Sequence, residues 1–356
     1  DLVRSRGLGD VYKRQPQLRY DYNFLGNTHT ITGGAMLYNN VSPFSQLTGN
    51  TPWATTGRLD EKTLRTDWYT SFFFENKFTF GKFSFIPAVR FENIWTSINE
   101  QYNLARTKAK ETLGNQSNYA FMPLPGFGAE YNFNPWITAF ANASKSYRPI
   151  QYAQAYAAAP NTYVPKNLQP STAWTYEAGF RGNPKKWLSW QTSYFAINFD
   201  NQIGSVNPNH GPQTTVVGNI GNSTTVGWDN MLQLDFIGLA DEIRKTQSTL
   251  VVNDGKKVAP ANVSSLVDTY GSFSFVSGYT VQSGQFTSGE FNGKTPQYTP
   301  NYILRMGLLY NWRDRVKLGL TSTFNGSAYA NDNNTQDYYM PCLLYTSDAA
   351  DDLLCV

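Results

Sequence analysis

The feature that most constrains the fold is a long hairpin pattern over residues 123–149. Within 127–133, apolar or aromatic residues alternate with small or polar ones, and a period of two is typical of a strand whose two faces differ. Asn134 and Pro135 interrupt the alternation as a tight turn does, and a second arm covers 136–147. Because aromatic residues flank the turn, the pattern predicts a hairpin whose turn end lies at a membrane–water interface.

The rest of the chain repeats this plan. Twelve segments are predicted as strands, over 20–25, 28–38, 67–80, 83–98, 127–133, 136–147, 174–181, 187–203, 226–236, 266–281, 302–311 and 316–325. Most of these segments exceed the 5–6 residues of an average strand. Long polar connections, predicted over 39–65, 99–117, 148–172, 204–223 and 282–299, alternate with short ones near 26, 81, 134, 184 and 313. Outer-membrane barrels show this alternation of long extracellular loops and short periplasmic turns.

The connection over 237–265 is the exception, because it is long but falls at the end of the strands where the other connections are short turns. We expect a short helix within it, over 240–245. Its length is the weakest point of the barrel interpretation.

Composition supports a membrane barrel. Aromatic residues make up 15% of the chain and charged residues only 15%, against about 25% charged in average soluble proteins. No run approaches the ~20 apolar residues that a membrane-spanning helix needs. The prediction is therefore an all-β fold, a partial antiparallel transmembrane β-barrel. The complete barrel must close because an unpaired strand edge is unsatisfied in lipid, whereas this part of it alone is expected to form an open, curved sheet. A soluble β-sandwich or propeller, whose strands also alternate, is the other interpretation.

The two ends differ from the rest. Residues 10–15 (DVYKRQ) and 342–347 (CLLYTS) can be encoded by DNA strings that are reverse complements apart from their end bases. That shared string looks like a transposon end used in preparing sequencing libraries. We therefore expect 1–15 and 342–356 to be sequencing-adapter artefacts and 16–341 to be a fragment of the barrel. Both cysteines, Cys342 and Cys355, then fall in the excluded tail, so no disulfide or zinc site is predicted.

Four segments carry a family resemblance. Residues 144–149 (SKSYRP), 168–182 (LQPSTAWTYEAGFRG), 194–203 (YFAINFDNQI) and 85–92 (FIPAVRFE) occur in an order and spacing similar to those of TonB-dependent outer-membrane receptors, ferric-dicitrate receptors in particular. After Gly227, Trp228 stands where the family pattern has an acidic residue, and Asp229 follows it.

This resemblance implies a receptor in the bacterial outer membrane rather than an enzyme, with no cofactor. Such receptors have barrels of about 22 strands filled by an N-terminal plug domain, so this sequence would supply about twelve strands and no plug. They take up scarce ligands, here a ferric siderophore or ferric citrate, energised by the TonB–ExbB–ExbD complex. Outer-membrane lipid is the other expected partner, and nucleic acid is not expected from a net charge of +3 without a basic run. The alternatives are a passive outer-membrane porin and a soluble secreted β protein that binds glycans.

Candidate site residues follow from their expected positions. Lys145 and Arg148 lie where a strand enters a long outer loop; they either attract an anionic chelate or, as we favour, are charged groups of the barrel rim. The loop tyrosines either form an aromatic ligand surface or are ordinary exposed side chains; they are Tyr152, Tyr156 and Tyr163. Four charged residues face the expected lumen, and ion pairs toward the plug are favoured for them over ligand contacts; they are Arg90, Glu92, Glu177 and Arg181.

No catalytic or metal site is predicted. His29 and His210 are far apart and have no nearby cluster of ligands. Neither a pair of carboxylates, a Ser/His/Asp set nor a phosphate-binding glycine loop occurs in a supporting context.

Overall fold

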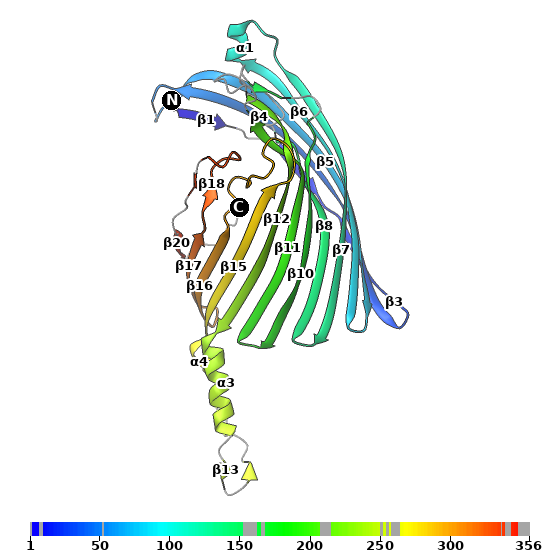
Figure 1. The fold of residues 1–356 in the computed structure, drawn as a ribbon, viewed down its shortest axis with the longest axis vertical. Helices are drawn as coiled ribbons and strands as arrows, with labels where there is room; N and C mark the ends of the chain where they lie inside the picture. Colours follow the sequence, from blue (N-terminus) through cyan, green and yellow to red (C-terminus); the bar gives the residue numbers. More distant parts are fainter. Residues whose placement is uncertain are drawn as a thin grey trace.

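One curved antiparallel sheet dominates the computed structural model (Figure 1). The structure describes the chain except residues 1, 7–9, 52, 152–161, 165–167, 207–214, 250–251, 254–255, 258–263, 336, 339–342 and 348–356. The strands of the sheet are β1 (Leu2–Arg6), β2 (Asp10–Arg14), β3 (Gln17–Phe24), β4 (Asn27–Gly49), β5 (Arg58–Phe80), β6 (Phe83–Asn103), β7 (Asn115–Asn134), β8 (Ile137–Arg148), β9 (Thr162–Tyr163), β10 (Ser171–Lys185), β11 (Leu188–Val206), β12 (Thr215–Asp235), β15 (Ser272–Phe286), β16 (Tyr302–Trp312), β17 (Val316–Asn325) and β20 (Leu343–Ser347).

The remaining elements are small. They are the helices α1 (Leu104–Ala109), α3 (Phe236–Thr249) and α4 (Leu266–Tyr270), and the two-stranded pairs β13 (Val252–Asn253) with β14 (Lys256–Lys257) and β18 (Ala328–Tyr329) with β19 (Asp337–Tyr338). Figure 1 shows α1 and α3 at opposite ends of the sheet.

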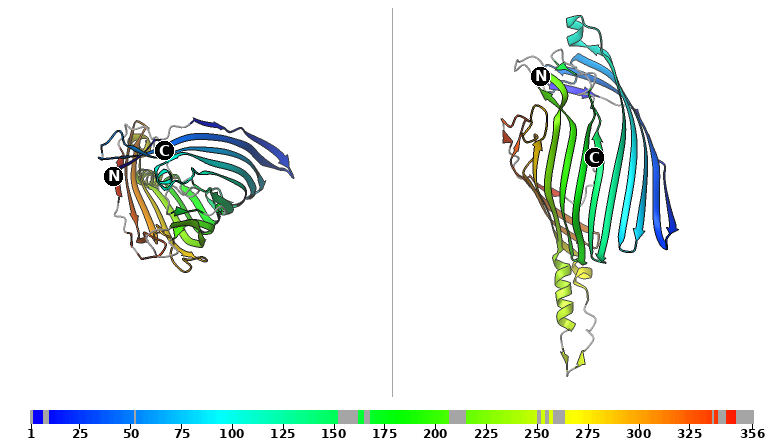
Figure 2. Two further views of the ribbon diagram at one scale, coloured as in Figure 1. Left: turned by 90° about the horizontal axis from the view of Figure 1, so that it is seen from above. Right: turned by 45° about the vertical axis from the view of Figure 1, so that its right-hand side comes forward.

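Strands that follow one another in the sequence are neighbours in the sheet from β4 to β17. Apart from the short parallel pairing of β9 with β12, every pairing is antiparallel, and the views in Figure 2 show an open, curved wall. The prediction of an all-β, partial antiparallel barrel is confirmed. β1, β2 and β20, which lie in the two ends assigned to an adapter, also pair with this sheet, and that assignment stays a prediction.

The two faces of the sheet differ as the alternation predicts. Aromatic side chains on one face are about half exposed, among them Phe72 at 52% and Trp228 at 53%. The other face carries polar side chains with almost no exposure, such as Ser71 at 1% and Glu92 at 2%. Side chains converge on the concave face of a curved sheet and splay apart on its convex face, so the polar residues lie on the concave face.

Two rows of exposed aromatic rings cross β5, β6 and β7 on the convex face. Neighbours in register form each row: Trp68, Trp95 and Tyr119 in the upper, Phe80, Phe83 and Tyr131 in the lower. The rows are twelve residues apart on each strand, about 40 Å along a strand and about 28 Å along the normal of a barrel tilted by about 45°. This spacing matches the ~25 Å apolar band between the aromatic girdles of outer-membrane barrels.

Above the upper row the predicted loops are wrong. β4 continues to Gly49, β5 begins at Arg58 and β6 reaches Asn103, so most of the loop expected over 39–65 and the start of the one expected over 99–117 are strands. β11 and β12 similarly extend into the loop expected over 204–223. The physical reason is that hydrophobic alternation marks only the part of a strand with one apolar face. A strand that continues into water keeps its backbone pairing and loses the pattern.

The connection over 237–265 is built around a helix. α3 contains the short helix expected over 240–245 and is longer, whereas 266–270 form α4 instead of the start of a strand. Asp241 links the two helices because its carboxylate accepts hydrogen bonds from the Leu266 amide (2.9 Å) and the Ser265 hydroxyl (3.1 Å). Figure 1 shows α3 extending along the long axis, away from the turn end of the sheet.

Neighbouring hairpins brace these helices. Glu242 of α3 pairs with Lys185 and accepts a hydrogen bond from the Trp187 indole. The last carbonyls of α4 are bound by side chains of the β16–β17 hairpin: Asp268 O by Arg313, Thr269 O by Trp312 and Tyr270 O by Tyr310, at 2.8 to 3.1 Å. The α3–α4 projection is therefore a braced structure and not a plain loop.

Candidate functional site

Three of the predicted site residues meet in one depression. Arg90, Glu92 and Lys145 line a cavity of about 440 Å³ with Tyr147. Arg90 and Glu92 come from β6 and Lys145 and Tyr147 from the end of β8. Sequence alone placed them in separate groups, because the distance between strands that are not adjacent cannot be derived from alternation.

Small residues make the floor of this depression. Gly126 lies between Ala88 and Ser144 on three neighbouring strands. A Cβ atom added to Gly126 would lie 3.8 Å from the Ala88 Cβ and 3.9 Å from the Ser144 Cβ. The floor is therefore low because three adjacent positions carry no side chain beyond Cβ or a hydroxyl, while longer side chains form the rim.

A polar network forms one side of the depression. Arg90 pairs with Glu92 through its Nε atom and donates hydrogen bonds to the Ser71 hydroxyl (2.8 Å) and the Tyr69 hydroxyl (2.9 Å). Glu92 Oε2 is buried and has no hydrogen-bond partner, and Tyr147 lines the same cavity. The network therefore holds a guanidinium group, a carboxylate and two phenols in one place.

Of the two rim residues, Lys145 is half-buried and lines the cavity, whereas Arg148 is exposed at the last position of β8, opposite Ser171. Tyr152 and Tyr156 lie outside the described residues. Tyr163 belongs to β9, which pairs with Val216 of β12. Whether these residues contact a ligand stays a prediction.

The other two lumen residues belong to separate contacts. Glu177 accepts a hydrogen bond from Asn142 (3.0 Å). Arg181 donates to Glu130 (2.5 Å), which also pairs with Lys77 at 3.7 Å. The wall thus provides its own partners for these charges, and their contact with a plug or ligand stays untested.

Sequence reasoning missed Tyr69 and Tyr147. Tyr147 belongs to the quoted segment 144–149, so the motif was noticed but its tyrosine was not. Tyr69 carried a signal that was overlooked: it lies in step with Ser71 and Glu75 on the polar face of its strand, although an aromatic residue in a membrane strand is ordinarily expected to face lipid.

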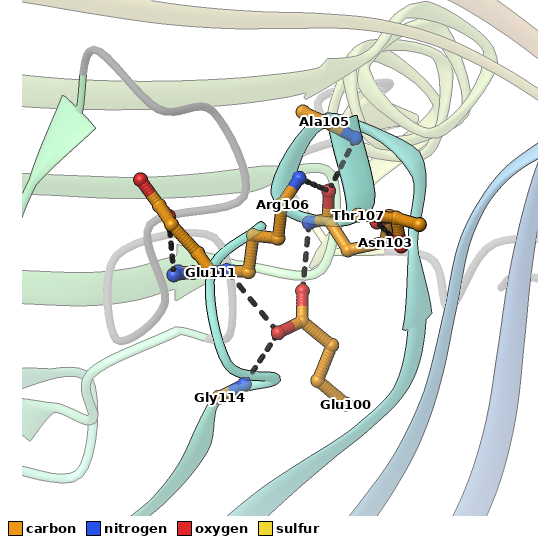
Figure 3. A network of polar contacts seen from close by, with 7 residues as sticks. All are labelled: Glu100, Asn103, Ala105, Arg106, Thr107, Glu111 and Gly114. Carbon is orange, nitrogen blue, oxygen red and sulfur yellow. Dashed lines mark hydrogen bonds and ion pairs between the residues drawn. The ribbon is translucent and has the colours of Figure 1, made fainter. Parts of the chain in front are cut away.

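A second polar network closes the far end of the wall (Figure 3). Glu100 accepts hydrogen bonds from Asn103 (2.7 Å) and the Gly114 amide (2.5 Å) and pairs with Arg106 at 3.2 Å. Asn103 in turn caps α1 by accepting from the amides of Ala105 (3.0 Å) and Arg106 (3.1 Å).

Glu61 lies beside this network on β5, where Oε1 is buried and has no hydrogen-bond partner. Burial raises the pKa of the Glu61 carboxyl, and the charge of Glu100 adds to that rise, while Arg65 opposes it. The end of the wall therefore contains one fully satisfied carboxylate and one that is costly to ionise.

Within the described ranges, no group of three or more His, Cys, Asp or Glu side chains lies close enough to hold a metal ion. The helices that the structure describes are all too short or too polar to cross a membrane.

Residues 3–349 match the family model described as TonB dependent receptor-like, beta-barrel. The chain belongs to this family. The resemblance predicted from the four sequence segments is thereby confirmed, and the family is one of outer-membrane transport receptors rather than enzymes.

Solved structures agree with this fold. The unliganded ferric citrate transporter FecA is 19% identical, with a TM-score of 0.64, and the match covers 96% of this chain and 47% of that one. The siderophore receptor PiuA from Acinetobacter baumannii is 14% identical, with a TM-score of 0.65 and coverage of 95% and 49%. The copper transporter OprC is 11% identical, with a TM-score of 0.60 and coverage of 92% and 45%. The chain thus spans about half the length of these structures, and at such identities the likeness establishes the fold alone.

Proposed function

We propose that this chain forms part of the wall of an outer-membrane receptor that takes up a ferric siderophore or ferric citrate, with energy from the TonB–ExbB–ExbD complex. The family match supports transport, and ferric citrate and siderophore receptors are among its structural neighbours. The girdle spacing worked out above supports a position in the outer membrane.

The observation that carries the proposal is the depression on the polar face. Arg90 lies five residues below Trp95 on β6, about 12 Å below the upper girdle for a strand tilted by about 45°. The depression therefore faces the lumen at membrane depth. Its lining contains two cations, Arg90 and Lys145, and two carboxylates, Glu75 and Glu92. Because Arg90 is already paired with Glu92, Lys145 is the cation that would meet an anionic group, whether a carboxylate of the plug domain or one of a ferric chelate passing it.

Residues of the remaining predicted set have narrower roles in this proposal. Arg148 and the tyrosines Tyr152, Tyr156 and Tyr163 would take part in the first contact with the ligand. Glu177 and Arg181 keep the wall charged lower in the lumen, where the plug lies in the complete receptor.

Uptake of radioactive iron tests the proposal. The complete gene is expressed in a bacterium lacking its own ferric citrate and siderophore receptors, with and without TonB, and is supplied with ferric citrate and a panel of ferric siderophores. We expect TonB-dependent uptake of at least one of them. Uptake that persists without TonB would indicate the passive porin instead.

Substitutions then test the depression. We expect the double variant Arg90→Ala, Lys145→Ala to lower uptake at least tenfold at equal amounts in the membrane. The matched control is Lys317→Ala, a cation that is 65% exposed beside the β16–β17 turn. Equal uptake by both variants would remove the depression from the proposal.

A further inference from the structure

One side of α3 continues the lipid-facing surface of the wall. Even-numbered residues of β12 point outward on the convex face, as Trp228 does. The helix begins at Phe236, directly after this strand, and the Phe236 ring centroid lies 5.8 Å from that of Phe273 on β15. Ala240 and Ile243, one and two turns further along the helix, are also exposed. Phe236, Ala240 and Ile243 are called the outer stripe below.

The opposite side of α3 is occupied by neighbouring elements. Asp241 binds the start of α4, and Glu242 pairs with Lys185. A Cβ atom added to Gly238 would lie 3.0 Å from the Trp187 Cβ, so the helix backbone packs closely on that side chain. At about 3.6 residues per turn, these three helix positions lie across the helix axis from the outer stripe. The braced side therefore fixes α3 with its apolar stripe turned away from the protein.

The junction between β12 and α3 sets the direction in which the stripe faces. Asp235, the last residue of β12, accepts hydrogen bonds from the Ile237 amide and the Phe273 amide, both at 3.1 Å. This carboxylate joins the end of one strand, the first turn of the helix and the start of the next strand. No loop separates strand from helix, so the outward direction of β12 is passed on to the stripe.

The length of the stripe matches the headgroup layer of a bilayer. Figure 1 shows α3 leaving the turn end of the sheet along the long axis. Ile243 is seven residues beyond Phe236, about 10 Å along the helix axis. The four residues after Ile243 are all polar. Because the polar layer on each side of the hydrocarbon core is about 5–8 Å thick, a stripe that starts at the level of the turns ends where water begins.

Exposed cations flank α3 at the same level. Lys186 of the β10–β11 turn lines a depression beside the helix, and the β16–β17 turn on the other side carries Arg313 and Arg315. Trp136, which lines the same depression, is 57% exposed. Lysine and arginine pair with phosphate groups, and tryptophan is enriched where membrane meets water. An apolar stripe between cations suits a phospholipid headgroup layer.

We propose that the outer stripe of α3 lies among the phospholipid headgroups of the periplasmic leaflet, where Lys186, Arg313 and Arg315 contact lipid phosphates. This inference rests on the outer-membrane position that supports the proposed function, and it adds a lipid contact beyond the ends of the strands. The polar residues after Ile243 then extend into the periplasm. The helix thereby fixes the depth of this part of the wall in the membrane.

Fluorescence quenching tests this position for the complete receptor in vesicles of phosphatidylethanolamine and phosphatidylglycerol. A fluorophore is attached in turn to Ile243→Cys, to Leu232→Cys on the outward face of β12, and to Lys108→Cys, which is exposed on α1 at the other end of the wall. Two nitroxide lipids serve as quenchers, one labelled on the headgroup and one within the acyl chain.

We expect the headgroup nitroxide to quench the label at 243 about threefold more than the acyl-chain nitroxide does, because the stripe lies outside the hydrocarbon core. The order should be reversed at 232, and the label at 108 should respond to neither lipid. A fourth label, at Gln247→Cys, lies one turn beyond Ile243 in the same direction. Headgroup quenching should be weaker there than at 243.

The outcomes separate this inference from the proposed function. A label at 243 that neither lipid quenches, beside acyl-chain quenching at 232, overturns the inference and leaves the membrane position of the wall intact. Water, a second copy of the receptor or another protein then covers the stripe. Equal headgroup quenching at 243 and 247 also overturns it, because the apolar fluorophore rather than the stripe then seeks the headgroups. Absence of acyl-chain quenching at 232 contradicts the membrane position itself.

Discussion

Replacing Asp241 should release α4 from the projection at the turn end. The Asp241 side chain is nearly buried and accepts from the Leu266 amide, the Ser265 hydroxyl and Lys245 Nζ at 2.9, 3.1 and 2.6 Å. The Leu266 contact does the work of an N-cap, worth about 1 kcal/mol, and the hydroxyl contact adds about 1 kcal/mol. The Lys245 side chain is 49% exposed, so that pair adds only about 0–1 kcal/mol.

Asp241→Ala should therefore lower the free energy of local unfolding of α4 by about 2–3 kcal/mol. Hydrogen exchange measures this change at the amides of Thr269 and Gly271, which donate to Ser265 O and Val267 O. A loss of about 2 kcal/mol corresponds to about 30-fold faster exchange of these amides.

Two variants sharpen the experiment. Asp241→Asn keeps a side-chain oxygen for the Leu266 amide and loses the pair with Lys245, so we expect it to cost less than about 1 kcal/mol. Gln247→Ala is the control, since Gln247 is an exposed residue of the same helix. Unchanged exchange in Asp241→Ala, or an equal effect of the asparagine and alanine variants, would refute the argument that the carboxylate caps α4.

Three further predictions concern other parts of the wall. His29→Ala should destabilise the barrel in urea by about 2–4 kcal/mol, because this buried ring accepts from the Thr79 amide (3.0 Å) and donates to Phe24 O (2.9 Å); a loss no larger than that of Thr28→Ala would contradict the role. Glu61→Gln should slow hydrogen exchange around α1 at pH 7, because the pKa of the Glu61 carboxyl is raised in the folded state and its ionised form therefore destabilises the fold. Protonation removes this cost, so the difference between the variant and the wild type should shrink as the pH falls, and a constant difference from pH 7 to pH 4 would contradict the prediction. DNA sequenced across both junctions of the source should show neither the 10–15 nor the 342–347 codons; their presence would make both ends part of the protein.

The sequence predicted the membrane part of the sheet well, because lipid imposes a pattern on residues. Phe72, Phe74 and Trp228 face outward on the strands where alternation placed them. The same rule failed above the girdle, where 39–49 and 58–66 lie in strands whose two faces both meet polar surroundings. The strands there are held by hydrogen bonds to the backbone of the neighbouring strand. These bonds impose no alternation of apolar and polar side chains that a sequence could reveal.

The candidate site was only partly predictable for a related reason. Alternation put Arg90 and Glu92 on the polar face, and the SKSYRP segment drew attention to Lys145. Bringing these residues into one cavity requires knowing that β8 separates from β7 above Ser144. The pairing of β8 with β7 ends at Ser144 opposite Gly126, and the alternation of side chains does not show where the pairing of two strands ends.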